Sequence, residues 1–76
     1  MTFAEKLRVM RAWRGLLQVE LSEKSGVPSS YISHLEAGRM IPKPAEEESL
    51  RQALGWDEAA DRAFAILAGE AETVVA

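Results

Sequence analysis

The stretch SGVPSSYISHLEAG, residues 25–38, places glycine, proline and serines between two helical patterns. Apolar residues precede it at helical spacing, and Ile32 and Leu35 continue such a spacing within it. Gly26 can adopt the positive φ that closes a helix, and the next helix begins two or three residues later. A connection this short makes the two helices cross steeply. The stretch therefore predicts a helix-turn-helix, whose second helix projects from the body of the domain.

Glycine and proline divide the rest of the chain into further short segments. These segments repeat apolar residues every three or four positions, and none alternates as a strand would. Pro44 suits the first turn of a helix, where no backbone donor is needed. We expect an all-α domain over residues 1–69, followed by a tail, residues 70–76, that is disordered or lies at a dimer interface. Five short helices are expected. The first carries Phe3, Leu7, Met10 and Trp13 or Arg14, the second carries Leu17, Leu21 and Lys24, and the third runs from about Pro28 or Ser29 to Glu36. The fourth begins at Pro44, and the fifth has a face marked by residues from Trp56 to Leu67.

Composition excludes several classes of protein. The 76 residues contain no cysteine and one histidine, so neither a disulfide nor a metal site is expected, and nothing indicates a cofactor or a small-molecule ligand. The longest apolar run, Ala63 to Ala68, is too short to span a membrane. The first residues are charged throughout and lack the apolar core of a signal peptide. These features predict a soluble, cytoplasmic domain.

The net charge of −3 is an average over two unlike halves. Residues 1–43 carry a charge of +3, whereas residues 44–76 carry −6. One interpretation is a basic binding face backed by an acidic body, and the other is two solvated surfaces without a partner.

The run QVELSEKSGVPSSYISHLEAG, residues 18–38, resembles the Cro/repressor-type helix-turn-helix family, also called lambda-repressor-like or XRE. The similarity continues outside this run at Leu7, Arg11, Gly15, Leu16, Pro42 and Ala53–Gly55. The resemblance implies a compact five-helix domain that binds double-stranded DNA, as a homodimer on a near-palindromic operator, and regulates transcription as a repressor or a restriction-modification controller. It also implies a nucleoid-associated protein of a prokaryote or a phage-infected cell.

The resemblance also implies roles for individual residues. The third helix would enter the major groove, where short hydroxyls and an imidazole can hydrogen-bond base edges. The implied base-reading residues are Ser29, Ser30, Ser33 and His34. The implied phosphate contacts are Gln18, Arg14, Lys24, Tyr31, Arg39 and Lys43. The alternative is that these residues form a polar solvent-facing surface with no binding function, with Ser30 helping to cap the helix.

Arg11 and Glu36 match a structural ion pair of the family, which ties the first helix to the end of the third. Three other residues depart from the family pattern. Leu17 stands where a capping Ser, Thr or Asn is common, and Pro28 replaces a common hydroxyl residue. Glu47 occupies a usually apolar position, which would change how the fourth helix sits.

The fifth helix carries more apolar surface than one small core needs. Its inward face is expected to hold Trp56, Ala60, Ala63, Phe64 and Leu67. Beside that face, the predicted dimer interface consists of Ala59, Ile66, Val74 and Val75.

Two other functions were weighed. An antitoxin-like module would use its acidic C-terminal half to neutralise a basic partner protein. An enzyme is not expected, because Ser33, His34 and Glu36 are near neighbours on one helix and cannot form a nucleophile–base–acid relay.

Overall fold

The computed structural model describes residues 1–69, which form five α-helices and no strand. The all-α, five-helix architecture is therefore confirmed. The helices are α1 (Phe3–Trp13), α2 (Gln18–Ser25), α3 (Ser29–Glu36), α4 (Pro44–Leu54) and α5 (Glu58–Leu67). None of them is long and apolar enough to cross a membrane.

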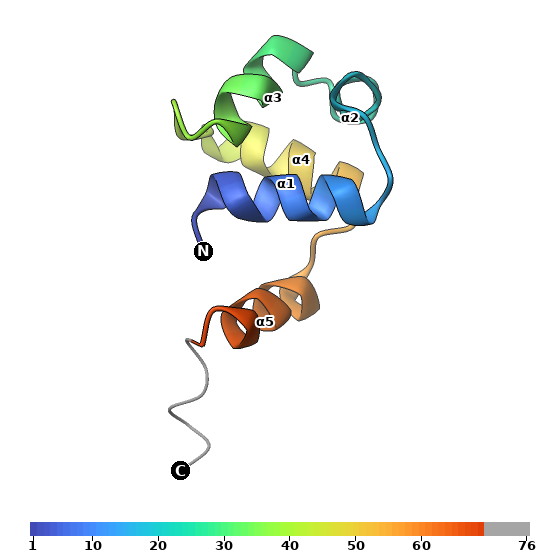
Figure 1. The fold of residues 1–76 in the computed structure, drawn as a ribbon. Helices are drawn as coiled ribbons and strands as arrows, with labels where there is room; N and C mark the ends of the chain where they lie inside the picture. Colours follow the sequence, from blue (N-terminus) through green and yellow to red (C-terminus); the bar gives the residue numbers. More distant parts are fainter. Residues whose placement is uncertain (70–76) are drawn as a thin grey trace.

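Four helices form the body of the domain, and α5 lies apart from them. Figure 1 shows α2 and α3 at one end of the molecule, α1 and α4 in the middle, and α5 at the other end. Gly26, with a φ of +79°, closes α2 as expected, and α3 starts only three residues later. The steep crossing that follows is the predicted helix-turn-helix.

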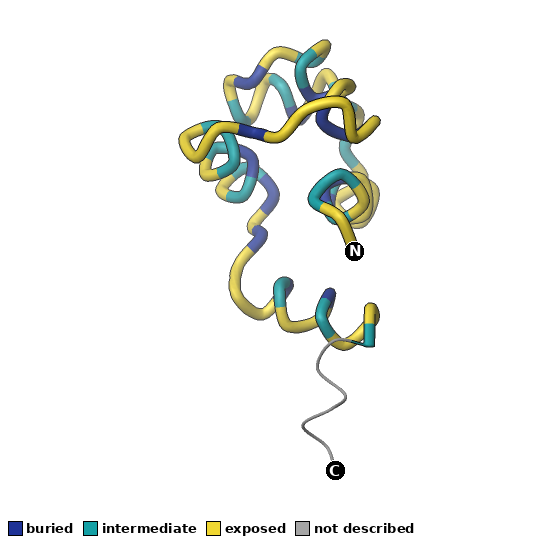
Figure 2. Tube along the Cα trace, turned by 90° about the vertical axis from the view of Figure 1, so that its left-hand side faces the viewer, coloured by how far each residue is buried: buried dark blue, intermediate teal, exposed yellow. Residues whose placement is uncertain are grey.

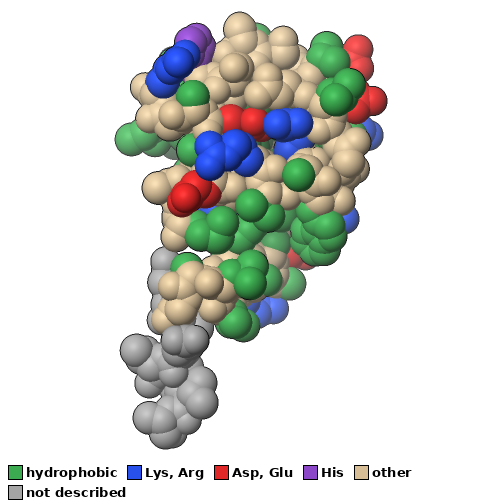
Figure 3. All heavy atoms as spheres, viewed as in Figure 1, with side chains coloured by type: hydrophobic (Ala, Val, Ile, Leu, Met, Phe, Trp, Pro, Cys, Tyr) green, Lys and Arg blue, Asp and Glu red, His purple; other side chains and the backbone are tan. Residues whose placement is uncertain are grey.

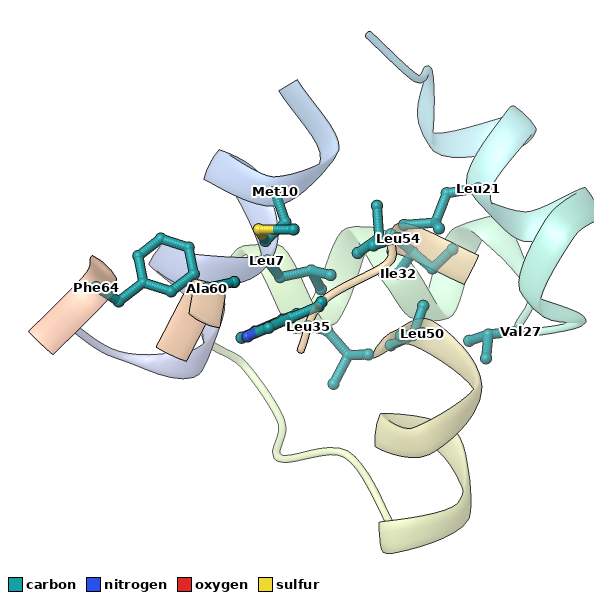
Figure 4. Close-up of a cluster of buried hydrophobic side chains, with 11 residues drawn as sticks. Leu7, Met10, Leu21, Val27, Ile32, Leu35, Leu50, Leu54, Ala60 and Phe64 are labelled. Atoms are coloured by element: carbon teal, nitrogen blue, oxygen red, sulfur yellow. The ribbon is translucent and has the colours of Figure 1, made fainter. Parts of the chain in front are cut away.

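The core lies between α1, α2, α3 and α4, and α5 covers one end of it. Figure 4 shows the buried side chains pointing toward one another from all five helices and the turn before α3. The core consists of Leu7, Met10, Leu21, Val27, Ile32, Leu35, Leu50, Leu54, Trp56, Ala60 and Phe64. A core of this size gives a small domain only modest stability, so single polar contacts between helices matter.

Carboxylates close the N-termini of four helices. Glu5 and Thr2 form a reciprocal capping box at α1, and Asp57 accepts a hydrogen bond from the Ala60 amide at α5. At α2 the N-cap is Leu17, which has no capping oxygen, and the side chain of Glu20 accepts from its amide instead. Glu46 does the same for the Lys43 amide before α4. α2 therefore keeps one half of a capping box, and the hydrogen bond that a hydroxyl at position 17 would accept from the first turn is absent.

Aromatic contacts attach α5 to the body. Trp56 stacks on Phe3, with 5.5 Å between ring centroids, and meets the edge of Phe64 at 5.9 Å. The guanidinium of Arg51 lies 4.4 Å from the Trp56 ring centroid. These contacts come from the N-terminal and middle parts of α5 and the residues just before it. As a result, much of the helix remains exposed (Figure 2).

The expected inward face of α5 was partly wrong. Ala60 and Phe64 are buried, but Ala63 is exposed and Leu67 keeps 75% of its surface exposed. The reason is that α5 touches the body along a narrow strip, so only residues spaced by four reach the core. Ala59 and Ile66, two of the predicted dimer residues, are exposed as well, whereas Val74 and Val75 lie outside the described residues.

Candidate nucleic-acid interface

Four polar side chains share the outer side of α3, and we call them the reading face: Ser29, Ser30, Ser33 and His34. Positions 29, 30, 33 and 34 fall on one side of a helix because they are related by four-residue steps. Within residues 1–69, none of these side chains forms a hydrogen bond or an ion pair. Pro28 is the N-cap of α3 and no side chain caps it, so Ser30 does not have the capping role of the alternative interpretation.

The opposite side of α3 is held by the rest of the domain. Ile32 and Leu35 are fully buried there, and Glu36 is buried beside them. Arg11 forms the predicted ion pair with Glu36, through Nε to Oε2 at 2.6 Å and Nη2 to Oε1 at 2.9 Å. Gln18 Nε2 donates to the same Oε1 at 3.0 Å. Glu36 therefore joins α1, α2 and α3 at one point.

The pair of Arg11 and Glu36 is shielded from water. The exposed fractions of the two side chains are 22% and 5%. The hydrogen bond from Arg11 to Glu36 raises the pKa of Arg11, because it stabilises the charged guanidinium more than burial disfavours it. A bidentate pair in this setting fixes both the distance and the rotation of α3 against α1.

Tyr31 holds the first turn of α3 against α4. Its hydroxyl donates to Glu46 Oε1 at 2.7 Å, and the same oxygen accepts from the Lys43 amide at 2.9 Å. These two hydrogen bonds, that of the Lys43 amide first, lower the pKa of Glu46, and the pKa of Tyr31 is raised. Tyr31 was predicted as a phosphate contact, but its hydroxyl is already bound within the protein. Its observed role is to brace α3.

Three arginines at three-residue spacing along α1 form what we call the arginine row: Arg8, Arg11 and Arg14. Arg8 Nη1 donates to the backbone carbonyl of Glu36 at 2.6 Å. Arg14 Nε donates to the carbonyl of Leu54 at 2.7 Å, at the C-terminal end of α4, and its guanidinium lies against the Trp13 ring. Arg14 was predicted to contact phosphate. Because the backbone at the end of α4 binds its guanidinium, we propose a structural role for Arg14 instead.

Besides Gln18, whose side-chain amide donates to Glu36, the remaining predicted phosphate contacts fall into two groups. Arg39 follows α3, and Lys43 precedes α4. Neither side chain forms a hydrogen bond or an ion pair within the described part of the chain, so both cations are available to an anionic ligand. Lys24 instead borders a hollow near the C-terminal end of α4, together with Arg14. Figure 3 shows the chain's one histidine beside a basic side chain, at the end of the molecule away from α5.

The structure also identifies residues that the sequence reasoning missed. No role in holding α3 was predicted for Arg8 or for Glu46, which was expected only to favour the N-terminus of α4 with its charge, although both hold α3 in place. The three-residue spacing of the arginine row was visible in the sequence, and it indicated that all three side chains lie along one side of α1. No feature of the sequence indicated that their partners are carbonyls at helix ends. Among residues 1–69 no group of His, Cys, Asp or Glu could hold a metal ion.

Comparison with known proteins adds a family and two relatives. A protein-family profile described as a helix-turn-helix domain matches residues 2–64. The chain is 43% identical over 54 residues to the HTH-type transcriptional repressor RghR of Bacillus subtilis strain 168, which covers 70% of this chain and 40% of that protein. It is 34% identical over 55 residues to the immunity repressor protein of Bacillus phage phi105, which covers 72% and 38%. The chain thus spans less than half the length of these relatives. No solved structure matches it significantly.

Proposed function

Because the chain belongs to the Cro/repressor-like helix-turn-helix family of DNA-binding regulators, we propose that its reading face enters the major groove and recognises a specific operator. The proposed action is that of a transcriptional repressor. Both relatives are named as repressors, one of them as a transcriptional repressor, and neither is named as an antitoxin.

One observation carries the proposal. Within residues 1–69, the four side chains on the outer side of α3 form no hydrogen bond or ion pair, whereas the polar side chains on its inner side, those of Tyr31 and Glu36, are all bound. Serine hydroxyls can donate to or accept from base edges, and an imidazole can donate to guanine. Arg39 and Lys43 lie in the loop after α3, and their cationic groups form no hydrogen bond or ion pair within residues 1–69, which suits phosphate contacts.

We also propose that two copies associate through α1 and α5. A hollow of about 250 Å³ between these helices is lined only by apolar side chains, among them Val9, Trp13, Ala63 and Leu67. Trp13 keeps 69% of its surface exposed and Leu67 keeps 75%. Figure 3 shows hydrophobic side chains gathered on this part of the surface. A two-fold dimer places two reading faces about 34 Å apart, facing successive major grooves of a near-palindromic site.

The test of DNA recognition starts with a pool of random duplexes, from which the wild-type protein selects its preferred sequence. Fluorescence anisotropy then compares binding to the selected duplex and to a mixed-sequence duplex at several salt concentrations. We expect the selected duplex to bind at least about a thousandfold more tightly at physiological salt. Equal binding to both duplexes would overturn the proposal of sequence recognition.

The dimer has its own test. Sedimentation equilibrium of the wild type should give a mass near twice that of the 8.4 kDa chain at high micromolar concentration. Leu67→Glu introduces a charge into the exposed apolar surface and should give a monomer of unchanged helix content. A wild type that is monomeric both free and on DNA would rule out this interface.

A further inference from the structure

Backbone carbonyls in the last turn of α3 are nearly all satisfied by the chain that follows. The carbonyls of Ser33, His34 and Leu35 accept from the amides of residues 37, 39 and 38, at 3.0 to 3.1 Å. The carbonyl of Glu36 is different, because Arg8, 28 residues earlier in the sequence, donates to it. A helix end normally leaves such carbonyls to water or to local turns. Here a side chain of another helix closes it.

We propose that Arg8 is a positioning residue for base recognition, because it caps the C-terminus of α3 and fixes the turn that carries Ser33 and His34. This inference rests on the proposed function of the reading face. A guanidinium at this point both satisfies a carbonyl and places a positive charge at the negative end of the helix dipole. Arg8 thereby acts on the backbone of Glu36, while its neighbour in the arginine row, Arg11, acts on the side chain of that residue.

The position of the cap makes its effect local. Ser33 and His34 lie in the last turn of α3, next to the carbonyl that Arg8 binds. Ser29 and Ser30 lie in the first turn, which the hydroxyl of Tyr31 holds against α4. Loss of the Arg8 cap should therefore let the last turn fray, while the first turn keeps its place. Base pairs read by His34 should be affected, and those read by Ser30 should not.

The experiment uses the whole chain and three variants. Arg8→Met removes the donors and the charge but keeps an unbranched stem, and Arg8→Lys keeps the charge and donors on a shorter head group. Arg62→Met is the matched control, because Arg62 is an exposed arginine of α5 for which the structure shows no hydrogen bond or ion pair within residues 1–69.

The first measurement needs no DNA. Amide hydrogen exchange should become several-fold faster at residues 37–39 in Arg8→Met, because their hydrogen bonds close the last turn. The change should be smaller in Arg8→Lys and absent in Arg62→Met. Unchanged exchange at these amides in Arg8→Met would overturn the cap.

The second measurement separates a positioning residue from a phosphate contact. On the duplex selected by the wild type, Arg8→Met should bind about tenfold more weakly, with the salt slope unchanged. Its effect should be non-additive with that of His34→Ala and additive with that of Ser30→Ala. Equal weakening on the selected and mixed-sequence duplexes, with a log–log salt slope smaller by about 0.9, would instead make Arg8 a phosphate contact. If the wild type selects no duplex, the proposed function fails, while the exchange measurement still decides the cap.

Discussion

Both sides of α3 carry polar residues, but the polar residues of the two sides differ in what they touch. On the inner side, Tyr31 and Glu36 are bound by side chains of α1, α2 and α4. On the outer side, none of the residues of the reading face has a side-chain partner within residues 1–69. The difference shows that the hydrogen-bond and ion-pair partners of a polar side chain indicate whether it stabilises the fold or faces a ligand. Residues of the inner side should affect unfolding, and residues of the outer side should affect DNA binding.

The largest effect is expected at the ion pair on the inner side. Arg11→Ala leaves the buried carboxylate of Glu36 without its bidentate partner, which should lower the free energy of unfolding by about 3 kcal/mol. This is a large share of the total of about 5 to 10 kcal/mol expected for a domain of this size. Urea denaturation followed by circular dichroism measures it. An unchanged unfolding midpoint together with lost DNA binding would show that Arg11 belongs with the outer surface.

The reading face should respond in the opposite way. His34→Ala and Ser30→Ala should each weaken operator binding by about 1 to 3 kcal/mol and relax the preference at one or two base pairs per half-site. Their melting temperatures should stay at the wild-type value, because neither side chain forms a hydrogen bond or an ion pair in the part of the chain that the structure describes. Binding titrations over a library of operator variants give the preferences. If both variants retain the wild-type preference while still binding the operator, α3 is not the reading helix.

Two arginines sharpen the comparison, since one is bound within the protein and the other is free. Arg14→Met should lower the free energy of unfolding by about 1 kcal/mol, because the Leu54 carbonyl loses a charged donor, and should leave the salt slope of DNA binding unchanged. Arg39→Met should leave unfolding unchanged and reduce the salt slope by about 0.9. If Arg39→Met lowered the free energy of unfolding and Arg14→Met reduced the salt slope, Arg14 would be the phosphate contact and Arg39 the structural residue.

The smallest effect concerns the hydrogen bond from Tyr31 to Glu46. The pKa of Glu46 is lowered in the folded state, so its contribution is complete above its ordinary pKa of 4.5 and is lost as pH falls through the folded value. The pKa of Tyr31 is raised, so its contribution persists up to its ordinary value of 10.0. The stability difference between wild type and Tyr31→Phe should be constant between these values and shrink on acidification. Urea titrations at pH 3 and pH 7 test this, and an equal difference at both would contradict it.

The fold was predictable from the sequence because its signals are local. Gly26 closes α2, Pro44 opens α4 and Asp57 caps α5, each within a few residues of the feature that it determines. The partners of Arg14 and Tyr31 were not predictable, because they lie 40 and 15 residues away in the sequence. The residues next to an arginine in the sequence do not reveal whether it faces solvent or binds the carbonyls at the end of a distant helix. The exposure of Leu67 was missed for a related reason, since helical spacing indicates a face but not how much of it is covered.

The lack of hydrogen bonds and ion pairs at the reading face within residues 1–69 affects how the DNA preference of such a domain can change by mutation. Mutations at positions 29, 30, 33 and 34 remove no side-chain hydrogen bond or ion pair formed within residues 1–69, so we expect selection on folding to constrain these positions less than the inner side of α3. Duplicated copies of the gene could then drift toward different operators without passing through unfolded intermediates. The same independence suits the domain to laboratory evolution, in which these four positions are randomised together while the arginine row and Glu46 stay constant.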